Sequence, residues 1–516
     1  MNKTYRIIYN HHTGTYVAVA ENTHARGKAS RAGKALSTVA VGAVLALSSM
    51  NAAAVEFYAT GGGNSNATGM AIGGDGVCAP STQAGQVVYD AQGNPFSTTG
   101  NNHLAWVEGN GGLAIGTGCY AQTVALQNAV ATGNGASAGE NAVAIGTLAL
   151  AAKNSSVAIG NGSQAFNTNS VAIGVAAKAT DMNAIAIGAG AQANGIALGN
   201  QAIAFHNRDI SIGDNAGNVK NSNGDNVIIG YGAGNGADGF LYPSGYHPGL
   251  SSTVMIGPHS GSGAQGNQNV MVGGHSGASS IGNENSYIGI YAGGGSIGSY
   301  NVANGFEAGR NQIGSHNVAM GKYAAYQQQG SFNSALGGYA SRLAEGNGNS
   351  STGFAASTLL VGDNNVAMGA SAGSELWAKE NKNGQLDYFN RANKAVGIWD
   401  PNEANAYKNQ VSNTVSIGNW AISRSDNGVA VGNNAVVDKN VAGSLALGSQ
   451  SYVNVANSVA LGSVANVAAT AVTGANIGGT APVGVVSVGK VGAERQIQNV
   501  AAGQVTAFST DAINGS

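Results

Sequence analysis

Apolar and small residues alternate along this chain in short runs that return at a fixed interval. Between residues 141 and 199, runs of the form apolar-Ala-apolar-Gly end at Gly146, Gly160, Gly174, Gly188 and Gly199. Successive closing glycines lie 14, 14, 14 and then 11 residues apart. This interval is too short for a helical hairpin repeat and fits one coil of a β-solenoid, with two short strands and two turns. The pattern therefore predicts an all-β fold, a parallel β-roll of stacked coils.

The interval lengthens to 16 residues further along the chain. Glycines then recur at Gly257, Gly273, Gly289, Gly305, Gly321, Gly337, Gly353 and Gly369. From Gly273 onward an asparagine stands four residues before each of them, from Asn269 to Asn365. We expect the glycines of both intervals to be turn residues, because Gly accepts turns that β-branched residues resist. An asparagine at one place in every coil suggests a stacked ladder, or a turn side chain bonded to the backbone.

The alternation within each run predicts which side chains share a face. Side chains on a strand point alternately to its two faces, so Val143 and Ile145 share one face and Ala144 takes the other. Branched residues favour the pleated conformation, and we expect them to fill the coil interior. The small residues would then line an outer face that another surface can approach closely.

Breaks in this register divide the chain into segments. Residues 231–252 and 374–411 are rich in aromatic residues, and we expect the first to form a loop-like insertion and the second a short helix or hairpin. A terminal coil needs a cap, because its open end exposes unpaired strand edges. The expected segments are an export segment (1–54), a cap or irregular coils (55–111), coils of about 14 residues (112–230), an insertion (231–252), coils of 16 residues (253–373), a second insertion (374–411), further coils (412–463) and a final segment (464–516).

The N-terminal segment reads as an export signal. An apolar stretch at residues 35–47 follows basic residues and is too short to span a bilayer securely. It leads to three alanines ending at Ala54, a small-residue site that predicts cleavage before Val55. An N-terminal anchor helix is the alternative. Two cysteines in an exported chain can pair, so we expect a disulfide between Cys78 and Cys119, although their spacing does not establish that the side chains meet.

Composition supports a repeat protein and narrows the partners. Of 516 residues, 82 are Gly and 9% are charged, against roughly 7% Gly and about 25% charged residues in ordinary chains. Glycine does not recur at every third position, which excludes collagen. Residues 1–34 carry a net charge of +5 and the remainder −7. Without a basic stripe beyond residue 34, we expect no nucleic-acid partner.

Motifs for catalysis or metal binding are weak. Ser137, Ser296 and Ser371 stand in Gly-x-Ser-x-Gly strings, but such strings arise by chance here and lack a strand-turn-helix context. The histidines have no Cys or His at ligand spacing, and we interpret them as isolated: His206, His259, His275 and His316. A hexapeptide-repeat acyltransferase would have a period of about six. We therefore expect no catalytic residue, no cofactor and no metal.

Three parts of the chain resemble the trimeric autotransporter adhesins of the YadA-like type. Residues 1–54 look like their extended signal region, and the Ser-Val-Ala-Ile-Gly coils over 112–462 look like their head repeats. Their neck resembles the segment that contains Glu494, Arg495, Gln496, Asn499 and Asn514. The resemblance implies a left-handed parallel β-roll, a homotrimer of chains side by side, and then a neck, a stalk and a membrane anchor. We expect a fragment that ends within the neck, with membrane attachment only through an anchor outside this chain.

The resemblance also implies a function. An adhesin head on the surface of a Gram-negative bacterium would bind host cells or extracellular matrix of the collagen, fibronectin and laminin class, with autoaggregation or biofilm formation as a second role. Many identical coils would bind through multivalency. The rival is a phage-type fibre, whose coils are similar but which has no secretion signal, so residues 1–54 argue against it. We expect a specific ligand at the 16-residue coils or at the two insertions.

Overall fold

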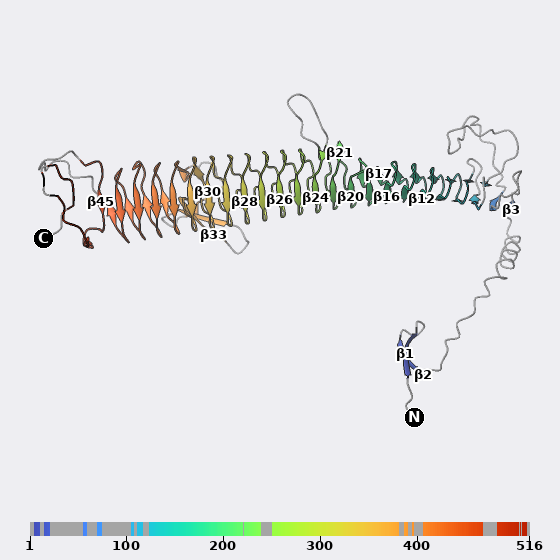
Figure 1. The fold of residues 1–516 in the computed structure, drawn as a ribbon, viewed down its shortest axis with the longest axis horizontal. Helices are drawn as coiled ribbons and strands as arrows, with labels where there is room; N and C mark the ends of the chain where they lie inside the picture. The colour runs from blue at the N-terminus through green and yellow to red at the C-terminus, as the bar shows by residue number, and fades with distance from the viewer. Residues whose placement is uncertain are drawn as a thin grey trace, which may run out of the picture.

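The protein forms a long rod of stacked coils (Figure 1). The computed structural model describes residues 5–10, 15–20, 55–58, 70–74, 105–107, 111–116, 123–219, 221–238, 250–380, 386–390, 395–396, 406–467, 482–504, 506 and 508–512. All regular elements within these ranges are strands, and the long sheet along the rod is parallel. The predicted all-β parallel solenoid is therefore confirmed. None of the described residues form a helix long and apolar enough to cross a membrane.

One sheet runs the whole length of the rod, with one strand from each coil. Neighbouring strands pair in strict register, as Ala144 with Ala158 and Ala158 with Ala172. Its strands are β4 (Met70–Gly74), β6 (Leu113–Gly116), β8 (Val130–Thr132), β10 (Val143–Ile145), β12 (Val157–Ile159), β14 (Val171–Ile173), β16 (Ile185–Ile187), β18 (Ile196–Leu198), β20 (Ile210–Ile212), β22 (Val227–Ile229), β24 (Val254–Ile256), β25 (Val270–Val272), β26 (Ser286–Ile288), β27 (Val302–Asn304), β28 (Val318–Met320), β29 (Ser334–Leu336), β30 (Ser350–Thr352), β32 (Val366–Met368), β37 (Val415–Ile417), β39 (Val429–Val431), β41 (Leu445–Leu447), β43 (Val459–Leu461) and β45 (Val486–Ser487).

A second strand in each shorter coil forms the opposite sheet. In the first part of the rod these are β5 (Ala105–Val107), β7 (Thr123–Ala125), β9 (Ser137–Ala138), β11 (Leu150–Ala151), β13 (Gln164–Ala165), β15 (Lys178–Ala179), β17 (Gln192–Ala193) and β19 (Ile203–Ala204). In the last part they are β38 (Ile422–Ser423), β40 (Val436–Val437), β42 (Tyr452–Val453) and β44 (Asn466–Val467). Two strands per coil is the arrangement that the 14-residue interval predicts.

The structure reverses the expected faces of the long sheet. Ala144 is fully buried, whereas Ile145 beside it keeps an exposed fraction of 39%. Ala151, from the second strand of the same coil, is buried against the same alanine cluster. The expectation that the branched residues fill the interior is therefore wrong. Two strands joined by such short turns lie too close together for Val or Ile to fit between them, so alanine fills the core and the branched side chains point outward.

Glycine closes the turn after each strand of the long sheet. The thirteen turn glycines named above have φ between +125° and +138°, a region that L side chains rarely adopt. They also stack on one another: a Cβ added to Gly160 would lie 2.4 Å from the carbonyl oxygen of Gly174 in the next coil. Both the dihedral angle and this close approach require glycine. A side chain at one turn would push two coils apart.

The asparagines of the 16-residue coils form a buried ladder. The Asn317 Nδ2 donates to the Gly330 carbonyl oxygen at 2.9 Å, and its Oδ1 accepts the Asn333 backbone N–H at 2.9 Å. The same pair of bonds recurs along the ladder, with small variations. Each asparagine therefore bonds to backbone on the next coil. The stacked ladder and the side chain bonded to the backbone, the two interpretations of the sequence pattern, are one and the same arrangement.

The longer coils replace the second strand by a longer turn. Between Gln265 and Val361 the opposite sheet is reduced to single parallel bridges, one per coil. The interior is wider here and takes larger side chains, including Met271 and Tyr287. Glycine provides the room opposite them, because a Cβ on Gly293 would lie 2.3 Å from the Tyr287 ring. A large core side chain at one position of a coil is thus accommodated by a glycine at another position of the same coil.

The two expected insertions differ. Residues 231–238 continue the coil, since Asp238 forms a bridge with Gln265, and residues 239–249 lie outside the described ranges. On either side of that gap, β21 (Ser222–Gly224) pairs with β23 (Leu250–Ser251). Within 374–411 the chain forms an antiparallel sheet, the hairpin alternative, and then returns to the rod. Its strands are β33 (Leu376–Glu380), β34 (Leu386–Asn390) and β35 (Ala395–Val396), followed by β36 (Asn409–Gln410), which pairs with β31 (Leu360–Val361).

An antiparallel strand covers the N-terminal end of the rod. The strand β3 (Val55–Tyr58) pairs antiparallel with β4, which is itself in register with β6. An antiparallel partner interrupts the parallel stack and so covers the edge on which another chain could add. Val55, the expected first residue after cleavage, begins this strand. Before it, β1 (Tyr5–Asn10) and β2 (Thr15–Ala20) form an antiparallel pair in the expected export segment.

Candidate binding surfaces

The first candidate surface is the outward side of the long sheet, which we call the outer strand face. It consists of the first and third side chains of each strand from β8 to β43. Ile288 and Met320 on this face have exposed fractions of 43% and 45%. Soluble monomers rarely expose contiguous apolar patches larger than a few hundred Å². A row made mostly of Val, Ile, Leu and Met along a rod, interrupted by polar residues such as Asn304, Ser350 and Thr352, therefore indicates an interface with protein.

A second candidate surface is a ladder of stacked rings beside the turn glycines. Successive ring centroids of His259, His275 and Tyr291 lie 5.0 and 4.8 Å apart, and Tyr231 meets His259 edge-on. In this first ladder the rings of His259, His275 and Tyr291 are half-buried, whereas Tyr231 is exposed. The interpretation of His259 and His275 as isolated is therefore wrong. Both occupy the second position after a turn glycine, and that 16-residue spacing could have been found in the sequence.

A second ladder stands just before the ladder asparagines. The His316 ring lies between those of Tyr300 and Phe332, with centroids 4.8 Å apart on both sides. These rings are exposed, Phe332 to a fraction of 65%. His316 thus stacks on aromatic rings rather than on another histidine. Stacking follows directly from the parallel register, because identical positions of successive coils lie about 4.8 Å apart.

The base of the second insertion packs on a cluster of rings and cations. Leu376 and Tyr407 contact Tyr323 and Tyr339, and the Lys408 Nζ lies 2.5 Å from the Glu345 Oε1. The guanidinium of Arg342, itself buried, lies 5.4 to 5.7 Å from the centroids of Tyr323, Tyr326 and Tyr339. Burial, together with the charge of Glu307, raises the pKa of Tyr323. The insertion is thus fixed against the 16-residue coils by apolar contacts and an ion pair.

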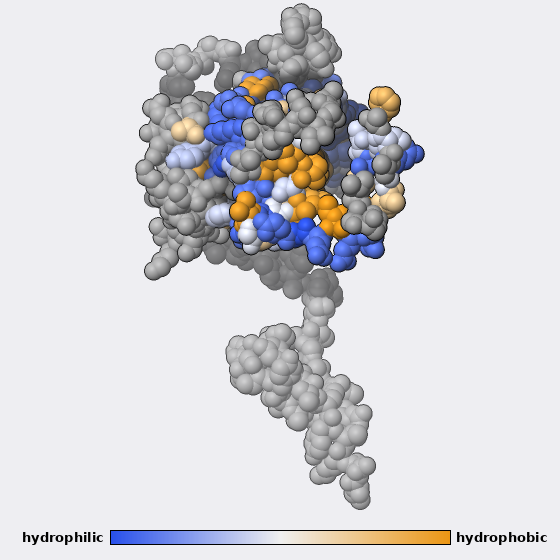
Figure 2. All heavy atoms as spheres, turned by 90° about the vertical axis from the view of Figure 1, so that its left-hand side faces the viewer, coloured by the Kyte–Doolittle hydropathy of each residue, from blue (hydrophilic) through white to orange (hydrophobic). Residues whose placement is uncertain are grey.

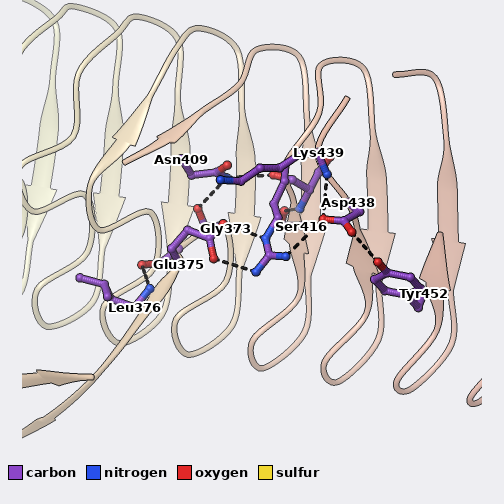
Figure 3. A network of polar contacts seen from close by, with 11 residues as sticks. Gly373, Glu375, Leu376, Asn409, Ser416, Asp438, Lys439 and Tyr452 are labelled. Atoms are coloured by element: carbon purple, nitrogen blue, oxygen red, sulfur yellow. Dashed lines mark hydrogen bonds and ion pairs between the residues drawn. The ribbon is translucent and has the colours of Figure 1, made fainter. Parts of the chain in front are cut away.

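A polar network holds the other side of the same insertion (Figure 3). The Arg424 Nη2 donates to the Glu375 Oε2 at 2.8 Å, and its Nη1 lies 3.4 Å from the Asp438 Oδ1. Burial alone would lower the pKa of Arg424, but these two carboxylates raise it. Burial opposes ionisation of Asp438, yet bonds from Tyr452, the Lys439 N–H and Arg424 lower its pKa. The hydrogen bond to Asp438, with burial, raises the pKa of Tyr452.

The serines of the Gly-x-Ser-x-Gly strings are parts of coils. Ser137 lies in β9, and Ser371 is buried. The buried Ser296 donates to the Gly293 carbonyl oxygen and lies 2.7 Å from the Tyr287 hydroxyl. Burial raises the pKa of Tyr287 to about 12. Within the described ranges, no group of three or more His, Cys, Asp or Glu residues is placed to hold a metal ion.

The neck-like segment closes the C-terminal end of the rod. The Arg495 guanidinium donates to the carbonyl oxygens of Ser463 and Val488 at 2.6 and 2.7 Å, beside the last turn glycine, Gly462. The Gly492 N–H lowers the pKa of Glu494 by bonding to its carboxylate. Figure 2 faces this end and shows hydrophobic residues at its centre with hydrophilic residues around them. Gln496 and Asn499 are exposed.

Several predicted residues lie outside the described ranges. They are Ala54 of the cleavage site, Cys78 and Cys119 of the expected disulfide, and Asn514 of the neck-like segment.

Comparisons with known proteins match separate parts of the chain. The family model of the extended signal peptide of the type V secretion system matches residues 1–50. The YadA head domain repeat matches residues 137–163, 167–191, 193–216, 412–435 and 442–465. These matched ranges flank the 16-residue coils.

A curated relative matches over a short stretch. It is the autotransporter adhesin BtaE of Brucella suis biovar 1 (strain 1330), which is 66% identical over 38 residues. That stretch is 7% of this chain and 5% of the relative's length. The signal segment places the protein among those exported to the Gram-negative cell surface. The signal segment, the head repeats and the parallel solenoid together support a trimeric autotransporter adhesin.

Proposed function

We propose that this chain is a non-enzymatic adhesin head that attaches the bacterium to host cells or to extracellular matrix of the collagen, fibronectin and laminin class. The observation that carries the proposal is the rod itself, which presents the same outward positions again and again along its length. Each contact would be weak. Linking binding sites raises the overall affinity by about 10²–10⁴ without any new contact.

The same rod would work as a homotrimer. The outer strand face is mostly apolar from β8 to β43, and burial of such a face against copies of itself removes it from water. Three parallel chains with their outer strand faces toward a common axis would bury it completely. The opposite side of each coil, including the bridge positions Ile297 and Ile313, would remain exposed to partners.

The 16-residue coils and the insertion fixed to them are the proposed ligand surface. They lie between the matched head repeats and carry features that the shorter coils lack. The first ladder offers half-buried ring edges beside the Arg310 guanidinium, 4.9 Å from the Tyr291 centroid. Rings and guanidinium groups are enriched where proteins bind proteins. Autoaggregation between cells would use the same multivalency.

A binding assay tests this proposal. The full chain, unfused and fused after Ser516 to a trimeric coiled coil, would be applied to immobilised collagen, fibronectin and laminin, with albumin as the blank. We expect binding to at least one matrix protein. The fused trimer should bind about 100-fold tighter than the unfused chain at a concentration where that chain is monomeric. Tyr291→Ala should weaken it, whereas Gln329→Ala, at an exposed bridge position, should not. Binding no stronger than to albumin would refute the proposal.

A further inference from the structure

Two rows of side chains border the outer strand face in the 16-residue coils. The row that we call the entry edge stands just before the ladder asparagines and includes Glu284, Tyr300, His316, Phe332 and Gly348. The exit edge stands just after the turn glycines and includes Ile290, Phe306, Lys322, Gly338 and Phe354. Both edges expose large apolar side chains, among them Tyr300, Phe332, Ile290 and Phe306. Large apolar side chains therefore stand on both sides of strands whose outward residues are mostly apolar.

Neither the backbone conformation nor the packing within its own chain requires glycine at Gly338 on the exit edge. It does not have a positive φ, unlike the turn glycines. A Cβ built on it would meet the Phe354 ring at 3.6 Å, an ordinary contact distance. Gly274, at the same position four coils earlier, also has an ordinary φ, and its Cβ would meet Pro258 at 3.8 Å. Other coils place Pro, Ile, Phe, Lys or Ala there, so the coil itself accepts larger side chains than glycine at this position.

In three coils a glycine on one edge stands beside a larger residue on the other edge, whereas the coils of β26, β27 and β28 carry large residues on both edges. Gly338 follows the strand β29, and Phe332, the most exposed of the second-ladder rings, precedes it. Gly274 follows β25, and Gln268 precedes it. In β30 the order is reversed, with Gly348 before the strand and Phe354 after it; here a positive φ also favours glycine. Within one chain the strand separates the two edges, so their sizes in those three coils have no reason to match.

A closed ring of three chains provides that reason. In threefold symmetry every contact between neighbours is heterologous, and one edge of a chain meets the opposite edge of the next. Parallel chains related by a threefold axis have no shift along that axis, so residues of the same coil meet. The rise between the entry and exit positions of one coil is a fraction of the coil spacing of about 4.8 Å.

We propose that the entry edge of one chain packs on the exit edge of the next, as a seam between the subunits of the 16-residue coils. The Phe332 ring enters the notch at the neighbour's Gly338. The ammonium group of the neighbour's Lys322 meets the His316 ring, whose face attracts a cation. The Tyr300 ring packs against the neighbour's Phe306 ring. The seam rests on the proposed homotrimer and sets the register in which the three chains combine.

Cysteine cross-linking tests the seam directly. Phe332→Cys and Gly338→Cys would be combined in the full chain fused after Ser516 to a trimeric coiled coil. The control pair combines Gly338→Cys with Gln329→Cys, which lies on the exposed opposite side of the same coil. Oxidation, or a short bis-maleimide, should join the first pair into a covalent trimer, because each chain links to the next around the ring. The control pair and the parent chain, which keeps both native cysteines, should remain largely uncross-linked.

Packing supplies a second variant. Gly338→Leu has room in its own chain but would fill the notch, so trimer formation by the unfused chain should weaken by about tenfold. Gln329→Leu adds the same apolar bulk away from the seam and should leave trimer formation unchanged. Sedimentation measures both.

The outcomes separate the seam from the trimer. A covalent trimer with only the Phe332 pair supports the seam. A trimer in solution whose Phe332→Cys and Gly338→Cys thiols do not cross-link, and react with maleimide as fast as Gln329→Cys, overturns the seam and leaves the homotrimer standing. An unfused chain that stays monomeric, together with freely reactive thiols in the fused chain, overturns both.

Discussion

The asparagine ladder makes the 16-residue coils sensitive to a single amide. Asn317→Ala removes two hydrogen bonds, a part-buried one to the Gly330 carbonyl oxygen and a buried one from the Asn333 N–H. Its own backbone N–H still bonds to Asn301. Asn317 and Asn333 are both buried, so water does not replace the bond to the Asn333 N–H. Each buried group left unpaired costs about 1–3 kcal/mol, and the pair therefore about 2–6 kcal/mol.

The loss spreads beyond one coil. Solenoid stability is approximately a sum of repeat terms and interfaces between neighbours, and the ladder bonds of Asn317 are such interface terms. A loss of several kcal/mol compares with a total of about 5–15 kcal/mol for a typical domain. We expect the coils around Asn317 to open at lower denaturant than the shorter coils.

Chemical denaturation of the full chain measures this effect, with hydrogen exchange to locate it. Gln329→Ala is the control, because that side chain is exposed. Asn317→Asp adds a check on charge: a carboxylate without the amide donor would face the Gly330 oxygen, so its pKa should rise. The folded state then binds more protons than the unfolded one, and this variant should regain stability as the pH falls. If Asn317→Ala unfolds at the same denaturant concentration as Gln329→Ala, the ladder does not stabilise the coils.

Three further predictions follow from the turns, the polar network and the outer strand face. Gly160→Ala should lower stability by roughly 3 kcal/mol or more, since its methyl group would lie 2.4 Å from the Gly174 oxygen. Gly162→Ala is the control, because its methyl group would meet nothing within 4 Å. Equal denaturation midpoints of the two variants would contradict stacked turns. The pKa of Asp438 is lowered in the folded state, so its contribution to stability is present above its unfolded pKa and is lost as the pH falls through the folded pKa. Asp438→Asn should therefore be less stable than the parent at neutral pH and approach it in acid, and a constant difference in denaturation midpoint would speak against the network. Met320→Ser should weaken trimer formation by about tenfold in sedimentation but leave the single chain folded, and an unfolded chain would place Met320 in the core.

The period of the fold could be predicted from the sequence because every coil repeats the same residues at the same interval. Gly and Asn recur at constant intervals, and the strands pair in the register that those intervals require. Which side chains of each strand point into the core could not be predicted in the same way. Alternation separates Val143 and Ile145 from Ala144, but only the distance between the two sheets decides which set fits inside.

The candidate surfaces show a second limit. The first ladder is periodic in sequence, since His259, His275 and Tyr291 follow their glycines by the same two positions, and comparison of columns could have found it. The network around Arg424 has no such signal. Its partners Glu375 and Asp438 lie 49 and 14 residues away, on both sides of an insertion, and only the stacked coils bring them together.

The mass of the chain in solution tests the central claim, that an apolar outer strand face joins three rods. Sedimentation equilibrium of the full chain would be compared with a variant that carries Ile288→Ser and Met320→Ser on that face. The account predicts three times the mass of one chain for the parent, and dissociation of the folded variant to single chains. A parent that remains a soluble monomer at every concentration, or a variant that stays trimeric, would contradict it.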